Sequence, residues 1–363
     1  MNPDIFRNAL ILTGPTGCGK TALGVELAER LGAEIVSMDS MALYRGIDIG
    51  TAKPGAEERR RVPHHLVDVL QPWESASVAW WLKEAARCLE QIESRRKRVL
   101  FVGGTALYLK TLLRGLFDGP PADAELRRRL SQEADRAGCQ VLHQRLAAVD
   151  PAAAARLHSN DRRRIIRALE VWELTGRPIS AWQQQWKQEL RIEDRKQELR
   201  IEDRGWRIDD RTAQTDAPDP ALTPPSSILH PPSSILHPPS SILHPPSSIL
   251  YPRCLWLDLP REELYARINA RVDRMLAAGL VEEVRGLREL PQPLSREAAQ
   301  ALGYKEIFAY LDHQLSLADA VTKIKTRSRN FAKRQCTWFR QLPECRPVTA
   351  ELTFAIWGLT MDR

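Results

Sequence analysis

The chain has 363 residues, 43% of them hydrophobic, a formal net charge of +7 and a pI of about 9.2. This length and apolar content allow one large or two ordinary domains with a sizeable core, and the charge permits an anionic partner without requiring one. The six cysteines form no C-x-x-C pair and have no zinc-ligand spacing with histidine, which excludes structural zinc and indicates a reducing compartment.

The chain opens with a strand–loop–helix pattern. An apolar run (residues 9–12) precedes a glycine-rich motif, a helical pattern (22–31) follows it, and the motif consists of Gly14, Pro15, Thr16, Gly17, Cys18, Gly19, Lys20 and Thr21. A G-x-x-x-x-G-K-T motif in this context is typical of a phosphate-binding loop, because its glycines let successive N–H groups face one anion. Lys20 adds a charge for the outer phosphate, and Thr21 offers a hydroxyl to Mg²⁺. We therefore expect a di- or triphosphate site with Thr21 as the metal ligand; a chance glycine turn is the alternative.

The same apolar run leads directly into this loop, so it does not resemble a removable signal peptide, and no stretch is long enough to span a bilayer. We expect a soluble, cytoplasmic protein.

Strands and helices then alternate. A second buried strand (34–38) ends at Asp39, and further strands are predicted at 64–70 and at 99–102, the latter ending in Gly103-Gly104-Thr105. Helices are predicted over 78–97 and 106–116. This order predicts an α/β fold with a doubly wound parallel sheet of the P-loop NTPase type. Ligands of such sheets lie beyond the carboxyl ends of the strands, so Asp39, after a strand expected beside the loop strand, is placed to face the phosphates.

From about residue 123 the sequence pattern changes. Helical spacing without strand patterns covers residues 123–135, 139–149, 151–158 and 161–175, which indicates a helical insertion rich in arginine. KQELRIEDR then occurs twice, and PPSSILH and its variant PPSSILY occur four times in tandem. A repeat unit that opens with Pro-Pro cannot bury itself as a solenoid, so we expect this stretch to be disordered and without a chemical role.

Order is expected to resume with a strand at 255–259 and a helix from 260. That helix carries five apolar residues on one face: Leu264, Ile268, Val272, Met275 and Leu276. Two more helices are predicted over 296–311 and 317–342. The last one combines many basic residues with an apolar stripe made of Val321, Ile324, Phe331, Trp338 and Leu342. The predicted organisation is a core in two parts (1–118 and 254–345), a helical insertion (119–186), a repeat-containing insertion (187–253) and a tail (346–363) without a readable signal.

A phosphate loop alone does not define a reaction. The chain has no N-K-x-D motif of a GTPase, and the strand at 99–102 ends in Gly-Gly-Thr where a motor ATPase has an acidic pair. A small-molecule or nucleotide kinase remains open, with a nucleic-acid-binding ATPase as a more distant alternative.

Several motifs resemble those of the tRNA dimethylallyltransferases of bacterial type, in order from about residue 10 to 342. They are GPTGCGKT (14–21), DSMALYRGIDIGTAKP (39–54), GGTALYLKTLLRG (103–115), NDRRRIIRALEVWELTG (160–176), ALGYKEI (301–307) and NFAKRQCTWFR (330–340). The resemblance implies transfer of a dimethylallyl group from dimethylallyl diphosphate to the exocyclic amine of the adenosine 3′ of the anticodon, with release of diphosphate. The implied partners are the tRNA anticodon stem-loop and dimethylallyl diphosphate, without a membrane, and we expect a monomer.

By this resemblance, Asp39 is the general base that takes a proton from the amine; a helix cap or an outer ligand of Mg²⁺ is its alternative role. The residues implied to contact tRNA are Asp39, Ser40, Met41, Ala42, Thr105, Arg127, Arg163, Arg164, Ile165, Ile166, Arg167, Gln300, Ala301, Leu302, Gly303, Tyr304 and Lys305. Arg163 stands where the family commonly has glutamine, which changes the expected contact from a base edge to a phosphate or a stacked base. Arg329 and Arg334 are candidates for a second cation at the diphosphate.

Overall fold

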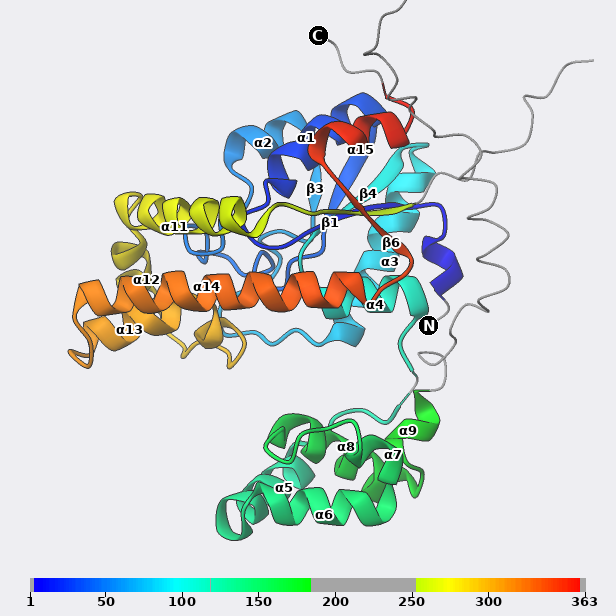
Figure 1. The fold of residues 1–363 in the computed structure, drawn as a ribbon, viewed down its shortest axis with the longest axis vertical. Helices are drawn as coiled ribbons and strands as arrows, with labels where there is room; N and C mark the ends of the chain where they lie inside the picture. Colours follow the sequence, from blue (N-terminus) through cyan, green and yellow to red (C-terminus); the bar gives the residue numbers. More distant parts are fainter. Residues whose placement is uncertain (1–2, 118, 184–252, 360–363) are drawn as a thin grey trace, which may run out of the picture. The chain divides into compact units, whose positions relative to one another are not determined.

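A computed structural model describes residues 3–117, 119–183 and 253–359 (Figure 1). The predicted repeat insertion (187–253) therefore lies outside the described residues, except for its last residue. In the described part of the chain, one sheet contains six strands: β1 (Leu10–Thr13), β2 (Ala33–Ser37), β3 (His64–His65), β4 (Arg98–Gly103), β5 (Cys254–Leu257) and β6 (Cys345–Val348). All neighbouring strands are parallel, which confirms the predicted α/β class with a parallel sheet.

The strand order is β3-β2-β4-β1-β5-β6. β4 therefore lies between β1 and β2, pairing Leu10 with Leu100 on one side and Ile35 with Leu100 on the other. The expectation that the strand before Asp39 is a neighbour of the loop strand was wrong. The carboxyl ends of β1, β4 and β2 nevertheless meet at one edge of the sheet, which is where a ligand site of a parallel sheet forms.

Helices cover both faces of the sheet. The helices outside the helical insertion are α1 (Lys20–Leu31), α2 (Ala56–Arg61), α3 (Val78–Ser94), α4 (Ala106–Arg114), α11 (Arg261–Ala277), α12 (Leu280–Arg288), α13 (Tyr304–Leu311), α14 (Leu317–Arg340) and α15 (Ala350–Ile356), with short 3₁₀ turns η1 (Pro3–Phe6) and η3 (Ala298–Gln300). Along β4, Val99 and Phe101 pack with α3, α4 and α12–α14, whereas Leu100 and Val102 pack with α1 and α15. Successive side chains of a strand point to opposite faces, so a continuous apolar run feeds both cores.

The predicted helical insertion has its own hydrophobic cluster. It contains α5 (Ala124–Ala137), α6 (Cys139–Val149), α7 (Pro151–Ala154), α8 (Arg162–Thr175) and α9 (Ile179–Trp182). Leu130, Leu142, Leu146 and Leu169 are fully buried among these helices. The apolar positions recur every three or four residues, which explains why helical spacing was readable in this region.

Three local features differ from the expectations. β3 has two residues instead of seven, because Leu66 and Asp68 adopt φ of +58° and +56°, outside the extended region. α12 was not anticipated; it begins after Gly279, whose φ is +96°. The 346–363 tail carries most of β6 and all of α15.

The buried face of α14 is also shifted from the predicted stripe. It consists of Ala320, Ile324, Ser328, Ala332, Gln335 and Phe339. Phe331, expected in that stripe, has 38% of its surface exposed. Ile324 and Leu342 of the expected stripe are buried and Val321 packs against the core, whereas small and polar residues of the buried face were not anticipated.

Two of the cysteines form a disulfide, which the cysteine pattern did not predict. Cys254 of β5 and Cys345 of β6 lie opposite each other in the strand register and are joined by a disulfide. Cys18, Cys88, Cys139 and Cys336 are free.

Candidate active site

The glycine-rich loop between β1 and α1 adopts a backbone that requires glycine. Gly14, Gly17 and Gly19 have φ of +155°, +84° and +90°, a region that residues with a Cβ rarely occupy. A Cβ on Gly17 would also lie 2.8 Å from Cγ1 of Ile268 in α11. The loop is thus wound tightly against α11 and delivers Lys20 and Thr21 as the first residues of α1.

A glutamine of α14 ties this loop to the end of β4. The backbone N–H of Thr16 donates to Oε1 of Gln335 at 2.9 Å, and Nε2 of Gln335 donates to the carbonyl of Gly104 at 2.7 Å. A Cβ on Gly104 would lie 2.6 Å from that Nε2 and 3.5 Å from Cε of Lys20. Gln335 is buried with both ends of its amide paired, so it fixes the loop relative to α14. Sequence reasoning missed this residue, although it lies inside a quoted motif.

Asp39 reaches the same place because β4 ends in two glycines. A Cβ on Gly103 would lie 2.2 Å from the carbonyl carbon of Met38, so the chain after β2 can pass close above the end of β4. Thr105 then holds this chain, its N–H donating to the carbonyl of Met38 at 3.2 Å and its Oγ1 accepting from the N–H of Ser40 at 3.1 Å. Asp39 Oδ1 accepts from the N–H of Met41 at 2.9 Å. Among the described residues nothing donates a hydrogen bond to its Oδ2.

A cavity of about 450 Å³ brings these parts together. Its walls include Lys20 and Thr21 of α1, Asp39 and Thr51 of the loop after β2, and Arg271 of α11. Of the other residues predicted to bind a substrate, the cavity is lined by Thr16, Ser40, Met41, Thr105, Arg163, Gln300, Ala301, Leu302 and Gly303. One cavity therefore joins cations, a carboxylate with an available oxygen, and much of the predicted RNA-contacting set.

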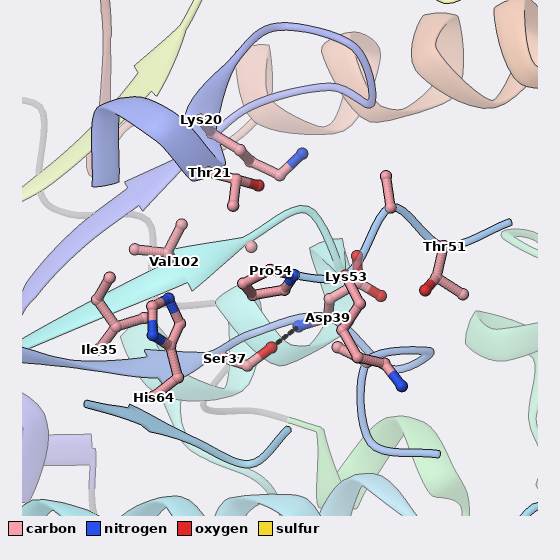
Figure 2. Close-up of a pocket in the computed structure, with 13 residues that line it drawn as sticks. Lys20, Thr21, Ile35, Ser37, Asp39, Thr51, Lys53, Pro54, His64 and Val102 are labelled. Atoms are coloured by element: carbon pink, nitrogen blue, oxygen red, sulfur yellow. Dashed lines mark hydrogen bonds between the residues drawn. The ribbon is translucent and has the colours of Figure 1, made fainter. Parts of the chain in front are cut away.

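A smaller cavity of about 50 Å³ shares several lining residues with the first, including Lys20, Thr21 and Asp39 (Figure 2). Ala42, another predicted contact, lines this smaller cavity. The remaining lining includes His64, whose pKa is lowered by burial. Asp39 thus lies at the junction of the two spaces.

Arg271 is a cation that sequence reasoning did not identify. Its Nη2 donates to the carbonyl of Thr51 at 2.9 Å. Burial lowers the pKa of Arg271, and the nearby charge of Asp39 acts in the opposite direction. The only sequence signal is an arginine on a helix that otherwise reads as amphipathic, which does not distinguish it from its arginine neighbours.

Of the two candidate diphosphate cations, only Arg334 lines the large cavity. Arg329 donates to Oδ1 of Asn269 in α11 at 2.7 Å and to Oγ1 of Thr326. Its guanidinium is used to connect α14 with α11.

The arginines of the helical insertion are partly paired. Glu170 is fully buried and accepts from Arg127 at 2.9 Å, from Arg167 at 2.7 Å and from the N–H of Asp123 at 2.7 Å. Burial acts to raise the pKa of Glu170, but the hydrogen bonds outweigh it, so the pKa is lowered. Arg164, with an ion pair to Asp161 at 3.2 Å, is exposed.

Three predicted RNA contacts are corrected by burial. Ile165 and Ile166 belong to the hydrophobic cluster of the helical insertion, where their side chains pack against other apolar residues. Tyr304 is fully buried and its hydroxyl bonds Glu283. These three side chains are not available to RNA, whereas Lys305 is exposed.

The donor set around Thr21 fits Mg²⁺ of the kind held mainly by substrate phosphates. Such an ion takes oxygen ligands, keeps several waters and needs only one or two protein oxygens. Thr21 lines both cavities beside Lys20 and Asp39, so its hydroxyl is placed beside the phosphates that the loop would hold.

No helix in the described ranges is long and apolar enough to cross a membrane.

Comparisons with known proteins agree on one family. A family model described as IPP transferase matches residues 42–215 and 233–342, and one described as isopentenyl transferase matches residues 7–66. Over 334 residues the chain is 44% identical to the tRNA dimethylallyltransferase of Geobacter metallireducens, a match that covers 92% of this chain and 89% of that relative.

Solved structures agree as well. The chain is similar to the tRNA isopentenylpyrophosphate transferase from Bacillus halodurans, with a TM-score of 0.57, 33% identity, and coverage of 97% of this chain and 94% of that one. It also shares the fold of a eukaryotic dimethylallyltransferase acting on tRNA, with a TM-score of 0.63 at 23% identity over 98% of this chain and 81% of that one.

Proposed function

This chain belongs to the IPP transferase family, and we propose that it transfers a dimethylallyl group from dimethylallyl diphosphate to the exocyclic amine of the adenosine 3′ of the tRNA anticodon. The enzyme is a prenyltransferase, and tRNA is its substrate. The observation that carries the finer proposal is the single cavity lined by Lys20, Thr21, Asp39 and residues 300–303. That arrangement supports a diphosphate on one wall and a nucleobase on the other.

In the proposed reaction, the loop from Gly14 to Thr21 acts as a phosphate loop for a leaving group. The allylic C–O bond breaks, and its electron pair goes to the diphosphate oxygen. Lys20 stabilises that developing charge, and Arg271 and Arg334 are two further cations that line the cavity. Thr21 and the diphosphate oxygens would hold Mg²⁺, which would supply additional charge neutralisation.

The amine of adenine is a weak nucleophile that must lose a proton as its bond to carbon forms. Asp39 is the only carboxylate shared by both cavities among the described residues. Its Oδ1 is held by the N–H of Met41, which fixes the carboxylate and leaves Oδ2 to accept the proton. Asp39 is therefore the proposed general base.

The adenosine must leave the stack of the anticodon loop to enter this cavity. Single-stranded loops are the parts of RNA whose bases can be turned out and read. Ser40, Met41 and Thr105 lie beside Asp39, and Arg163 and Gln300 also line the cavity, which supports contacts to the extruded base and its neighbours. Arg127 and Arg167 would contact tRNA while they remain hydrogen-bonded to Glu170. The monomeric state and the cytoplasmic location stay predictions.

The test offers the enzyme two labelled donors. Purified protein is incubated with labelled dimethylallyl diphosphate and tRNA, or with labelled ATP and a panel of metabolites. Label in tRNA that requires an adenosine beside the anticodon supports the proposal. Phosphate transfer to a metabolite would instead support the kinase that the loop motif alone allows, an alternative that the comparisons do not favour.

A further inference from the structure

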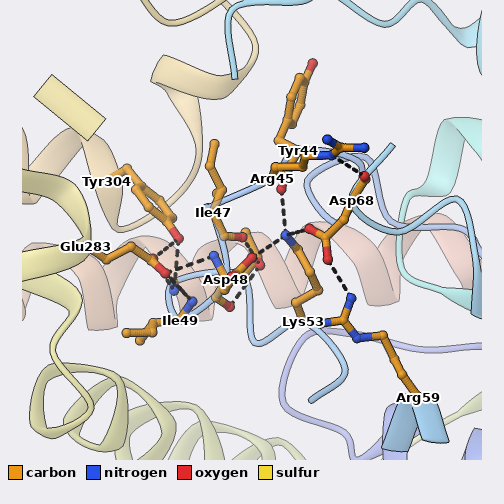
Figure 3. Close-up of polar contacts among 12 residues, drawn as sticks. Tyr44, Arg45, Ile47, Asp48, Ile49, Lys53, Arg59, Asp68, Glu283 and Tyr304 are labelled. Carbon is orange, nitrogen blue, oxygen red and sulfur yellow. Dashed lines mark hydrogen bonds and ion pairs between the residues drawn. The ribbon is translucent and has the colours of Figure 1, made fainter. Parts of the chain in front are cut away.

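A carboxylate outside the cavity holds the loop that forms one of its walls (Figure 3). Glu283 of α12 accepts from the N–H of Asp48 at 3.0 Å, of Ile49 at 2.9 Å and of Gly50 at 3.4 Å. Both carboxylate oxygens take part, since Oε1 bonds Ile49 and Gly50 and Oε2 bonds Asp48 and Ile49. Three successive backbone donors around one carboxylate make a charge-assisted arrangement that a neutral side chain cannot reproduce.

Tyr304 completes this arrangement. Its hydroxyl donates to Oε1 of Glu283 and accepts from the N–H of Gly50 at 3.1 Å. A Cβ on Gly50 would lie 2.4 Å from Cε2 of Tyr304, so the ring packs where only glycine fits. Burial, and then the charge of Glu283, raise the pKa of Tyr304 far above its usual range. The phenol therefore stays protonated and keeps donating to Glu283.

The far end of the loop is held by a second set of polar contacts. Lys53, only 2% exposed, donates through Nζ to the carbonyl of Tyr44 at 2.6 Å and to Asp68 at 2.6 Å, and it also bonds Asp48. Arg59 bonds the other oxygen of Asp68. The four residues between Asp48 and Lys53 are thus suspended between two polar anchors.

Three of these four residues line the cavities of the candidate active site. Gly50, Thr51 and Ala52 line the large cavity, and Thr51 and Ala52 also line the small one. The carbonyl of Thr51 receives the guanidinium of Arg271, the cation whose field interacts with Asp39. A continuous set of contacts therefore runs from Glu283 through the loop to Arg271, which lines the same cavity as Asp39.

We propose that Glu283, with Tyr304, is a positioning residue that holds Asp48–Thr51 so that Arg271 is fixed in the wall of the cavity that it shares with Asp39. Tyr304 directly follows residues 300–303, which line the cavity, and its hydroxyl bonds Gly50 of the loop that also lines it. The pair therefore connects these two parts of the cavity wall. The inference rests on the proposed function, since it assigns a role within the same site. Glu283 touches no substrate; its effect passes through the loop.

The role proposed for Glu283 predicts a lower kcat without a matching loss of tRNA affinity when its charge is removed. Both oxygens of Glu283 accept hydrogen bonds, so the amide of Glu283→Gln would turn an NH₂ group toward backbone N–H donors. The loop would then lose part of its support, and a small misplacement near reacting groups costs about 10- to 100-fold in rate. We expect kcat to fall by about that factor while the Kd for tRNA stays within about threefold of wild type.

Glu282→Gln is the matched control. Glu282 lies on the same helix and is 68% exposed, and its side chain forms an ion pair with Arg285 at 3.6 Å. It should keep the wild-type kcat and KM. Tyr304→Phe is the second variant; it removes one hydroxyl from the arrangement and should lower kcat in the same direction without changing the charge. Glu283→Asp, which retains the charge, should recover part of the rate lost in Glu283→Gln.

Hydrogen exchange of residues 48–50 supplies a readout independent of turnover. Faster exchange of these amides in Glu283→Gln and Tyr304→Phe, together with the lowered kcat, supports the inference. Unchanged exchange, or a wild-type kcat in both variants, overturns it. If wild type and Glu282→Gln both fail to modify tRNA, the proposed function fails, and the exchange result alone then decides whether Glu283 holds the loop.

Discussion

The buried ion cluster of the helical insertion yields a quantitative prediction. Glu170 has no exposed side-chain surface and accepts three hydrogen bonds from Arg127 and Arg167 and one from a backbone N–H. Glu170→Gln keeps the shape but removes the charge and one acceptor. If the amide nitrogen takes the place of Oε2, the hydrogen bonds from Arg127 Nη2 and Arg167 Nη1 are lost. Two charge-assisted hydrogen bonds at about 1.5 kcal/mol each lower the expected free energy of unfolding by about 3 kcal/mol. This lies at the low end for a broken buried pair, because both arginines still reach solvent.

Glu125→Gln is the matched surface control. Glu125 is 78% exposed and pairs with Arg128 one turn away, so its loss should cost about 0–1 kcal/mol. Urea unfolding of the intact chain, combined with hydrogen exchange of residues 124–175, measures both variants. Equal costs for Glu170→Gln and Glu125→Gln would refute the reasoning that burial decides the strength of these pairs.

The same cluster predicts an acid dependence. The pKa of Glu170 is lower in the folded state than the usual value of about 4.3 for an unfolded chain. Its contribution is therefore fully present above about pH 4.3 and is lost as the pH falls through the folded pKa. Wild type should lose protection in residues 124–175 in acid, and Glu170→Gln should show a smaller loss.

Two other predictions concern the loop and the repeats. Gln335→Leu should raise the KM for dimethylallyl diphosphate about tenfold, a cost of about 1.4 kcal/mol, because the N–H of Thr16 and the carbonyl of Gly104 lose their partner. Gln341→Leu, at an exposed position, is the control. An unchanged KM in Gln335→Leu would show that Gln335 does not hold the loop. Deletion of residues 196–252 should leave prenyl transfer and solubility largely intact, because that proline-rich composition buries little surface; loss of soluble protein or of transfer would show that the insertion contributes.

The local parts of the site were predictable because each has a signature within a short stretch. The glycine loop requires positive φ at Gly14, Gly17 and Gly19, and this requirement is visible as glycine spacing. Strands that supply both cores read as apolar runs, and the insertion helices show their 3.6-residue period. Asp39 was found from its place directly after such a run.

The long-range parts were not predictable in this way. Gln335, Arg271 and Glu283 are single polar residues on amphipathic helices, and each acquires its role from a partner more than 200 residues away in the chain. Their helical periodicity is unaffected by that role. Tyr304 shows the converse error, since its place in a family motif suggested RNA contact, whereas its ring is buried against Gly50.

The strand order was another non-local feature. β4 lies between β1 and β2 although it follows both in sequence. The Gly103-Gly104 pair, which lets the chain after β2 reach over β4, was visible in the sequence. Its meaning depends on knowing which backbone approaches it, here that of Met38.

The most direct test of the proposed mechanism is the single-turnover rate of dimethylallyl transfer to tRNA in Asp39→Ala, with tRNA affinity measured in parallel. Loss of the proton acceptor should slow the transfer step by about 10²- to 10⁴-fold while tRNA binding stays close to wild type. A variant that modifies tRNA at the wild-type rate would remove Asp39 from the role of base and contradict the account.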